Sequence, residues 1–238
     1  MHFLEVTLPT AAENVALDEA LLDAGEEGRG GEHLRIWELA QPAVIVGRSS
    51  RLAEEVRLDE CRRRGIEIVR RASGGAAIVA GPGCLLYSLI LCYGERPHLR
   101  HLDQAHGYVL GRLAAAIGRH VPGVAYRGTS DLAVGEKKFS GNSLRCKRDW
   151  FLYHGTLLYA AELDLIESLL ATAPRQPAYR GGRSHAQFVT NLPLARDALV
   201  EAVREAFAAG PVAEVWPQQD VQRLVREKYG REEWTTLR

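Results

Sequence analysis

The chain has 238 residues, 46% of them apolar and 25% charged, which is the composition of an ordinary globular protein with a substantial core. Lysine plus arginine and aspartate plus glutamate are balanced at 30 each, so no net positive field favours nucleic acid as a partner. No run of 18 apolar residues predicts a membrane span, and the first residues lack a basic segment followed by an apolar one. We therefore expect a cytoplasmic protein with neither nucleic acid nor a membrane as partner.

The first half of the chain alternates helical and extended patterns. Thr10 and Glu13 match a capping box, after which apolar residues recur at helical spacing until glycines begin at Gly25. Residues 85–91 form a nearly unbroken apolar run, which is typical of a central strand buried on both faces. The predicted elements, in chain order, are a first strand at 1–6, a helix ending before Gly25, strands at 34–37 and 43–46 joined by a turn at Pro42, a helix at 54–64, strands at 66–70 and 76–80, and the central strand.

The second half begins with a predicted helix from about 104 to 119. Residues 131–141 predict a hairpin, because Gly135 followed by Glu136 suits a tight type II′ turn. The remaining predicted elements are a strand at 156–159, a short helix at 162–172, a loop rich in Pro, Gly and Arg at 173–190, and helices at 194–208 and 218–229. Strands occur both in hairpins and between helices, which predicts a mixed sheet packed with helices in one α+β domain.

Four cysteines are present, and their spacing matches neither a CxxC pair nor a zinc site. A disulfide framework is not expected in a cytosolic chain of this size. Cys61 and Cys92 lie in apolar periodic segments and are predicted to be core residues, whereas Cys84 and Cys146 lie near candidate functional motifs. No metal site is expected.

The first of these motifs is Arg70-Arg71-Ala72-Ser73-Gly74-Gly75-Ala76. Paired glycines after a strand let a ligand approach the backbone closely, and consecutive free amides can hold an anion. Either arginine could pair with a phosphate or a carboxylate. A tight turn with two exposed arginines is the alternative, and the run is not a P-loop because it has no Gly-Lys-Ser/Thr.

Two further motifs follow. Lys138, in the run Lys137–Asn142, lies on the returning strand of the predicted hairpin, where it could stabilise charge that develops during acyl transfer. A surface lysine is the alternative reading. His154, followed by Gly155, could act as a general base or could be a structural histidine satisfied by the backbone.

The order and spacing of these motifs resemble the lipoate–protein ligase and octanoyltransferase superfamily, which shares its catalytic fold with biotin protein ligases. The resemblance extends from about residue 14 to about residue 195. The matching stretches are Asn14–Leu21, Trp37 with Pro42–Arg48, Arg70–Gly75, Asp131, Lys138–Gly141, His154–Leu158 and Phe188–Leu192.

The resemblance implies a fold, a site and a set of partners. It implies a biotin/lipoate protein ligase-like, class II synthetase-like catalytic domain over residues 1–238, without a separate C-terminal accessory domain. It implies lipoate or octanoate as substrate, ATP with Mg²⁺, a lipoyl carrier domain of a 2-oxoacid dehydrogenase E2 or glycine-cleavage H-type protein, and a possible separate accessory subunit. Its implied tunnel residues are Arg70, Ser73, Gly74, Gly75 and His154, with Asp131 and the catalytic Lys138 at the reacting end, and Arg71, Ala76, Ser140, Gly141 and Gly155 as further binding residues.

Two mechanisms occur in the superfamily. Ligases form an acyl-adenylate from free acid and ATP, whereas transferases pass octanoate from acyl carrier protein through an acyl-cysteine, which requires a thiolate in the site. The stretches 126–131 and 172–180, where transferases place that cysteine, contain none. We therefore expect an ATP-dependent lipoate–protein ligase, with an octanoyltransferase as the alternative.

Three departures from the family pattern leave a third possibility open. Residues 75–84 lack the family's His-Asp pair, the serine-glycine-serine after the lysine is Ser140-Gly141-Asn142, and the chain ends too soon after the last match for the accessory domain. These departures are compatible with a non-catalytic subunit that binds a lipoyl-adenylate or a carrier.

Overall fold

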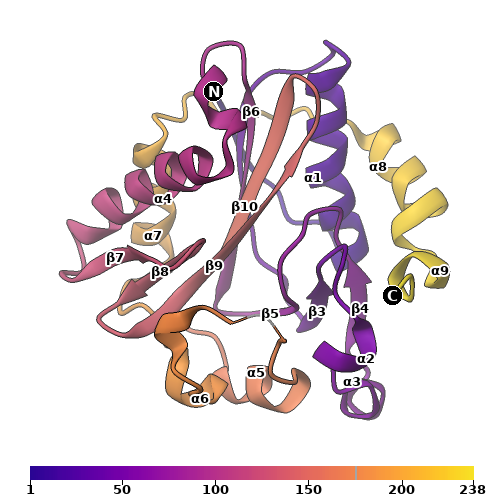
Figure 1. The fold of residues 1–238 in the computed structure, drawn as a ribbon. Helices are drawn as coiled ribbons and strands as arrows, with labels where there is room; N and C mark the ends of the chain where they lie inside the picture. Colours follow the sequence, from indigo (N-terminus) through magenta and orange to yellow (C-terminus); the bar gives the residue numbers. More distant parts are fainter. Residues whose placement is uncertain (175) are drawn as a thin grey trace.

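The computed structural model describes residues 1–174 and 176–238, and these form a large sheet, a small sheet and helices on both faces of the large sheet (Figure 1). The large sheet has seven strands in the described residues, and β1 and β2 pair in parallel whereas its other pairs are antiparallel. This arrangement confirms the predicted α+β class with a mixed sheet. In spatial order the strands are β1 (His2–Glu5), β2 (His33–Trp37), β6 (Cys84–Cys92), β10 (Trp150–Leu158), β9 (Lys137–Cys146), β8 (Asp131–Val134) and β7 (Val124–Arg127).

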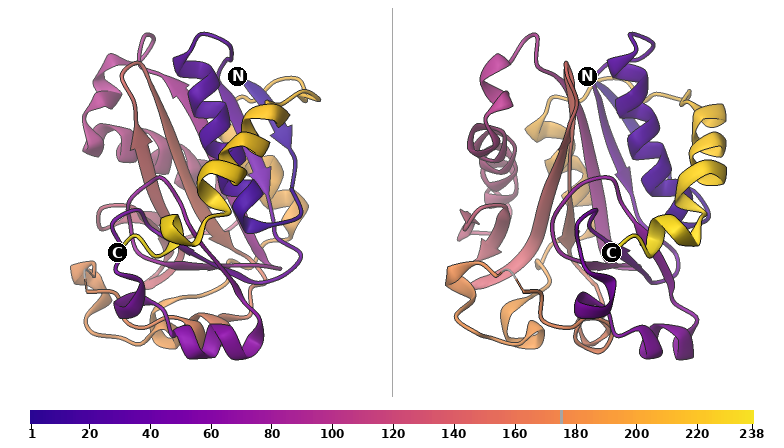
Figure 2. Two further views of the ribbon diagram at one scale, coloured as in Figure 1. Left: turned by 90° about the vertical axis from the view of Figure 1, so that its right-hand side faces the viewer. Right: turned by 45° about the vertical axis from the view of Figure 1, so that its right-hand side comes forward.

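Strand β6 runs through the middle of the molecule and is buried on both faces, as predicted. Because side chains alternate along a strand, its residues serve two cores. Leu86 packs with residues of helix α1 (Ala11–Glu26), whereas Leu85 packs with residues of α4 (Leu102–Gly118) and α7 (Arg196–Ala206). Figure 2 shows the same layering, with α4 and α7 on one side of the sheet and α1 on the other.

The small sheet holds the Arg-Arg-x-Ser-Gly-Gly run at the edge of the α1 core. Strand β3 (Ala43–Val46) pairs in parallel with β4 (Glu67–Arg70) and antiparallel with β5 (Ile78–Ala80). Strands β2 and β3 are consecutive, as predicted, but they belong to different sheets. The run begins at Arg70, the last residue of β4, and continues through the connection to β5. There Ser73 contacts His154 of β10, and the Gly74 carbonyl accepts from Ser143 of β9, so the run meets the large sheet.

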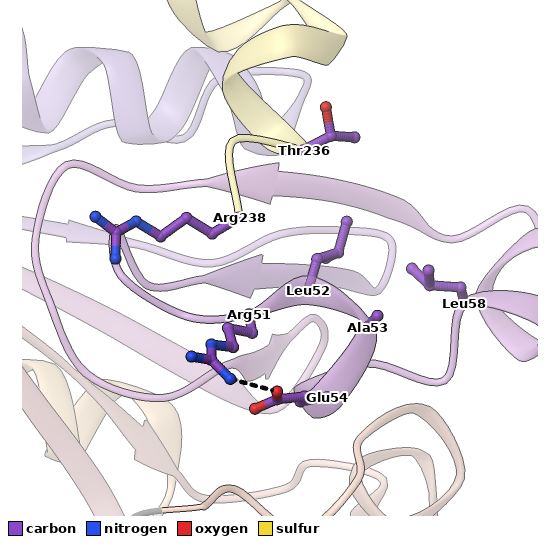
Figure 3. A pocket seen from close by; sticks show the side chains of 7 residues that line it. All are labelled: Arg51, Leu52, Ala53, Glu54, Leu58, Thr236 and Arg238. Carbon is purple, nitrogen blue, oxygen red and sulfur yellow. Dashed lines mark hydrogen bonds and ion pairs between the residues drawn. The ribbon is translucent and has the colours of Figure 1, made fainter.

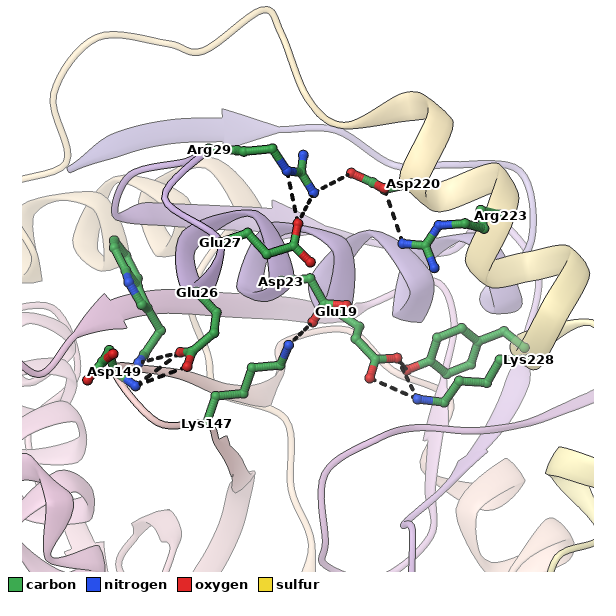
Figure 4. A network of polar contacts seen from close by, with 12 residues as sticks. Glu19, Asp23, Glu26, Glu27, Arg29, Lys147, Asp149, Asp220, Arg223 and Lys228 are labelled. Carbon is green, nitrogen blue, oxygen red and sulfur yellow. Dashed lines mark hydrogen bonds and ion pairs between the residues drawn. The ribbon is translucent and has the colours of Figure 1, made fainter.

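Helix α1 is fixed at both of its ends by polar contacts. The predicted capping box is present, because the Thr10 hydroxyl accepts from the backbone N–H of Glu13 and the Glu13 carboxylate accepts from the backbone N–H of Thr10. Further along, Glu19 accepts from Lys228 at 2.6 Å, and Asp23 pairs with Lys147 at the same distance (Figure 4). These contacts join α1 to the π-helical turn Val225–Tyr229 and to the turn between β9 and β10.

The predicted helix at 54–64 is wrong in one respect, because two short helices occupy this region. They are α2 (Leu52–Glu55) and α3 (Leu58–Arg64), and Gly65 ends the second in the left-handed conformation, as expected for a glycine that ends a helix. Between them Val56 is extended and forms a bridge to Leu170. The break therefore arises from pairing with a distant segment, which no local pattern reveals.

The second half of the chain follows the prediction with smaller differences. The β8–β9 hairpin turns at Gly135, which has φ of 58°. Strand β9 continues beyond residue 141, where the predicted hairpin ends, and β10 begins before residue 156, where its strand was predicted to start. The loop predicted at 173–190, of which Arg175 lies outside the described residues, contains a 3-10 turn (Ala178–Arg180) and the short helix α6 (His185–Phe188). The other helices are α5 (Leu163–Leu169), α8 (Gln218–Leu224), which continues as a π-helical turn to Tyr229, and α9 (Glu232–Thr235), which was not predicted. None of the described helices is both long and apolar enough to cross a membrane.

Candidate active site

A cavity of about 760 Å³ lies between α1, the small sheet and the large sheet. Trp37 on β2 lies at one end of its lining and Lys138 on β9 at the other, with β6 and β10 between them. Three strand spacings of about 4.8 Å separate these two strands by about 14 Å, so the cavity is long enough for an extended chain. Its apolar walls come from Val15, Trp37, Ile45, Ile78 and Leu86.

Lys138 and Asp131 form the polar end of the cavity. The Lys138 Nζ lies 2.7 Å from Asp131 Oδ1, and the Tyr179 hydroxyl donates to Asp131 Oδ2 at 2.9 Å. Burial, with the nearby Asp131 charge, raises the pKa of Tyr179, so this hydroxyl remains a donor. Because the lysine is only partly exposed and the carboxylate is buried, the ammonium is held in one place and aimed at the cavity.

Gly141 makes room for that lysine. A Cβ atom added at Gly141 would lie 2.8 Å from Lys138 Nζ, so any larger residue would push the ammonium aside. Gly155 has a comparable role on β10, because a Cβ there would lie 1.8 Å from Oδ1 of Asn142. The Tyr87 hydroxyl donates to that same oxygen at 2.5 Å. Each glycine therefore allows a specific polar side chain to cross the sheet surface beside the cavity.

His154 lines the middle of the cavity and belongs to a buried polar chain. The Arg71 Nε donates to Ser73 Oγ at 3.0 Å, and Ser73 Oγ lies 2.5 Å from His154 Nε2. Since the serine oxygen already accepts from the arginine, its own proton is best placed toward Nε2, which leaves the His154 proton on Nδ1. That nitrogen lies 3.5 Å from the carboxylate of Asp18.

Asp18 is an ionised carboxylate at the end of this series of hydrogen-bonded side chains. Burial alone would raise the pKa of Asp18, but the Arg35 charge 2.7 Å away and hydrogen bonds from His154 and Ser88 outweigh it and hold the pKa below 3.8. Asp18 and Arg35 are both buried, so each needs the other. Sequence reasoning gave neither residue a role, although a charge among the apolar positions of α1 is a signal for a buried ion pair.

The two arginines of the glycine-rich run bind backbone carbonyls. Arg71 donates to the carbonyls of Ile45, Gly74 and Ala76 as well as to Ser73, and burial lowers the pKa of Arg71 to about 10. Arg70 points the opposite way and is fully buried. Its N–H groups donate to six carbonyls, those of Gly47, Arg48, Ser50, Trp234, Thr235 and Arg238.

The structure thus brings most, but not all, of the expected site residues to the cavity. Those that line it are Arg71, Gly75, Ala76, Asp131, Lys138, Gly141, His154 and Gly155. Arg70, Ser73, Gly74 and Ser140 do not line it. Ser73 and Gly74 support it from behind, and the Ser140 hydroxyl accepts from Asn142 at 3.0 Å.

The four cysteines all lie in the described part of the chain, and none of them lines the cavity. Cys61 and Cys84 are buried, as sequence reasoning expected for the first, whereas Cys92 is only half-buried and Cys146 is exposed. Burial, reinforced by the Glu38 charge, raises the pKa of the Cys84 thiol to about 12, so this thiol is protonated at neutral pH. Among the described residues there is no group of three or more His, Cys, Asp or Glu side chains placed to hold a metal ion.

Comparison with known proteins gives a family model and a set of relatives. The model described as the lipoyl protein ligase A/B catalytic domain matches residues 10–210. The octanoyltransferase LipM of Brevibacillus brevis is 27% identical over 95% of this chain and 95% of its own length. The "Probable lipoate-protein ligase A" of Mycoplasma genitalium is 30% identical over 75% of this chain and 52% of its own length. The chain therefore spans about half the length of this ligase relative and nearly all of the LipM relative.

Solved structures show the same fold. A structure from Thermoplasma acidophilum, described as a bi-partite lipoate protein ligase and its E2 lipoyl domain, superimposes with a TM-score of 0.84 at 21% identity, covering 100% of this chain and 96% of that one. A lipoate-protein ligase A bound with ATP superimposes with a TM-score of 0.81 at 22% identity and covers 99% of both chains. These structures confirm the predicted fold, and the family model over residues 10–210 confirms the superfamily that the sequence motifs predicted.

Proposed function

Because the chain belongs to the lipoyl protein ligase A/B catalytic-domain family, we propose that it transfers a lipoyl or octanoyl group to a lysine of a lipoyl carrier domain. The observation that carries this proposal is the cavity, whose apolar walls lead to Lys138. An eight-carbon chain gains about 0.8 kcal/mol for each methylene that it buries there. The apolar length of the cavity therefore binds the chain, and the cation at its end receives the carbonyl.

Lys138 has the catalytic role in this proposal. When the amine of the carrier lysine attacks the acyl carbon, negative charge develops on the carbonyl oxygen, and a fixed ammonium next to it lowers the barrier. Asp131 positions Lys138 through the 2.7 Å contact. As the new C–N bond forms, the bond from the acyl carbon to its leaving group breaks, and the amine loses its proton to solvent.

His154 and its buried partners support the tunnel wall. Ser73 and His154 are hydrogen-bonded to each other, so the polar His154 side chain can line the cavity without leaving a buried polar group unpaired. We assign the same supporting role to Gly74 and Ser140. Gly75, Ala76, Gly141 and Gly155 allow the ligand close access, and Arg71 fixes the path of the glycine-rich run.

We propose an acyl-adenylate, formed with ATP and nucleotide-bound Mg²⁺, as the donor. The placement of the cysteines supports this choice, because a thioester intermediate requires a thiolate beside the acyl carbon. The buried Cys84 is protonated and outside the cavity, and the exposed Cys146 is also outside it. The ATP-bound relative of the same fold is consistent with this donor.

An octanoyltransferase is the second candidate. It is favoured by the similarity to LipM, which extends over nearly the full length of both chains, whereas the ligase relative is matched over half its length. A further candidate is a chain that needs a second subunit, by analogy with the bi-partite ligase from Thermoplasma.

One assay separates these candidates. The purified chain is incubated with a lipoyl carrier domain and either lipoic acid with Mg-ATP, lipoic acid alone, or octanoyl carrier protein, and the carrier is analysed by intact mass. The ligase predicts an adduct with lipoic acid only when ATP is present, and Lys138→Ala abolishes it. An adduct from octanoyl carrier protein that is lost in Cys84→Ser or Cys146→Ser contradicts the ligase and supports the transferase. No adduct from any donor, with adduct formation restored by a second subunit, supports the bi-partite alternative.

A further inference from the structure

The cations that line the cavity differ in whether they are free to bind a ligand. Among the described residues the lysines and arginines that line it are Arg51, Arg71, Lys138 and Arg238. Arg51 pairs with Glu54 at 2.8 Å, Lys138 pairs with Asp131, and the Arg71 guanidinium is occupied by carbonyls and by Ser73. The Arg238 guanidinium makes no hydrogen bond or ion pair with any described residue.

Arg238 is nevertheless held firmly by its backbone. Its carbonyl accepts from Arg70 at 3.2 Å and from the backbone N–H of Leu52 at 2.9 Å. The Trp234 indole N–H donates to the Arg70 carbonyl at 2.7 Å, so the segment 234–238 both donates a hydrogen bond to Arg70 of β4 and accepts hydrogen bonds from it. A fixed backbone with a free guanidinium is the arrangement of a binding residue, because little main-chain entropy is lost when a ligand arrives.

A second hollow lies beside this arginine. It measures about 570 Å³ and is lined by residues 51–54, Leu58, Thr236 and Arg238 (Figure 3). Arg51, Glu54 and Arg238 line both hollows, so the second adjoins the acyl cavity at these residues. In Figure 3 the guanidinium groups of Arg51 and Arg238 both extend away from Leu58. A ligand that enters the acyl cavity therefore has room to continue past two cations.

We propose that Arg238, whose backbone carbonyl is held by the hydrogen bond from Arg70, binds the phosphate of the acyl donor. The proposal rests on the acyl-transfer function argued above and names the part of the substrate that meets the C-terminal segment. The shared chemistry is a phosphate group in the acyl donor. In an acyl-adenylate this phosphate is bonded directly to the acyl carbonyl, whereas in an acyl carrier protein it lies at the other end of the phosphopantetheine arm from the acyl thioester. An arginine suits this role because its planar guanidinium donates two parallel hydrogen bonds to phosphate oxygens.

The test is analogous to a double-mutant cycle: the arginine is removed by mutation, the phosphate is removed from the ligand, and each change is made alone and together with the other. The ligands are octyl-AMP and its phosphate-free match 5′-O-octyladenosine, octanoyl-phosphopantetheine and its match octanoyl-pantetheine, and octanoate alone. Binding is measured by calorimetry for the wild-type chain, for Arg238→Ala and Arg238→Lys, and for Arg231→Ala as a control. Arg231 is an exposed arginine just before α9 that does not line either hollow.

The proposal predicts that Arg238→Ala weakens one phosphate ligand by about tenfold, as loss of a charge-assisted hydrogen bond would, and leaves its phosphate-free match within about twofold. Arg238→Lys restores part of the loss, and Arg231→Ala changes nothing. The pair that responds identifies the donor as adenylate or phosphopantetheine. An equal loss for both members of each pair, or no loss for any, overturns the role of Arg238 even if octanoate binds normally. Failure of the wild-type chain to bind octanoate and every octyl or octanoyl ligand overturns the acyl-transfer function itself.

Discussion

Replacing Gly141 by alanine separates the position of the Lys138 ammonium, which we propose is catalytic, from the stability of the fold. The added methyl would lie 2.8 Å from Lys138 Nζ and 3.0 Å from its Cε, which is too close for either atom. These atoms are the far end of a flexible side chain, so the lysine moves and the backbone stays. The Asp131 carboxylate is buried, but it keeps the Tyr179 hydroxyl as a donor when the lysine shifts, so the change costs about 1 kcal/mol, as for one hydrogen bond.

The cost to activity is much larger than the cost to stability. Displacing a positioned group by about 1 Å reduces the rate about 10²-fold, which corresponds to about 2.7 kcal/mol of transition-state stabilisation. A change of about 1 kcal/mol in stability shifts the melting temperature of a chain of this size by about 2–4 °C. Gly141→Ala should therefore be nearly as stable as the wild type and about a hundredfold slower.

The assay is single-turnover transfer from a pre-formed lipoyl-adenylate to a carrier domain, together with a thermal melt. Gly111→Ala is the control, because Gly111 lies on the exposed side of α4 and a Cβ there would meet no atom within 4 Å. It should keep full activity and gain roughly 0.5–1 kcal/mol of stability. Full activity in Gly141→Ala would show that Gly141 does not position the Lys138 ammonium, and a melting temperature lowered by more than about 10 °C would show that the added methyl disturbs the fold instead.

Three further results are expected. Gly155→Ala should destabilise the fold by about 1–3 kcal/mol in urea unfolding, because its methyl would overlap a side chain packed across β10; unchanged stability would count against this packing. Folding lowers the pKa of Asp18, so its contribution to the free energy of unfolding is present above pH 3.8 and is lost as the pH falls through the lower native pKa. The difference in unfolding free energy between the wild type and Asp18→Asn should therefore shrink over that range, and a constant difference would argue against an ionised Asp18. In the folded protein at pH 8, iodoacetamide should modify the exposed Cys146 and leave Cys84 intact by peptide mass mapping, whereas equal labelling of both would contradict the burial of Cys84.

The parts of the fold that sequence predicts well are those whose causes lie within a few residues. The start of α1 follows from Thr10 and Glu13, and the β8–β9 hairpin follows from Gly135. The hairpin also brings Asp131 within 2.7 Å of Lys138, so the contact between the two residues that we propose for the reacting end has a local cause. Unbroken apolar residues likewise identified β6 as a central strand.

The parts that sequence could not predict depend on contacts between distant segments. The helix expected at 54–64 is interrupted because Val56 bridges Leu170. Arg70 was expected at the acyl tunnel, but the structure turns it toward carbonyls more than 160 residues away in the chain, at Trp234 and Thr235. Arg70 is the last residue of β4 and Arg71 follows it, so their side chains face opposite sides, and only the packed structure decides which of the two faces the cavity.

In the proposed function the cavity holds the acyl chain with its carbonyl at Lys138. A crystal structure of the protein with bound octanoate or lipoate would show where the chain and its carboxylate lie. We expect a chain that runs along Trp37 and Leu86 and past His154, with its carboxylate within hydrogen-bonding distance of Lys138 Nζ. A ligand bound outside the cavity, or one in the reverse direction with its carboxylate beside Trp37, would contradict it.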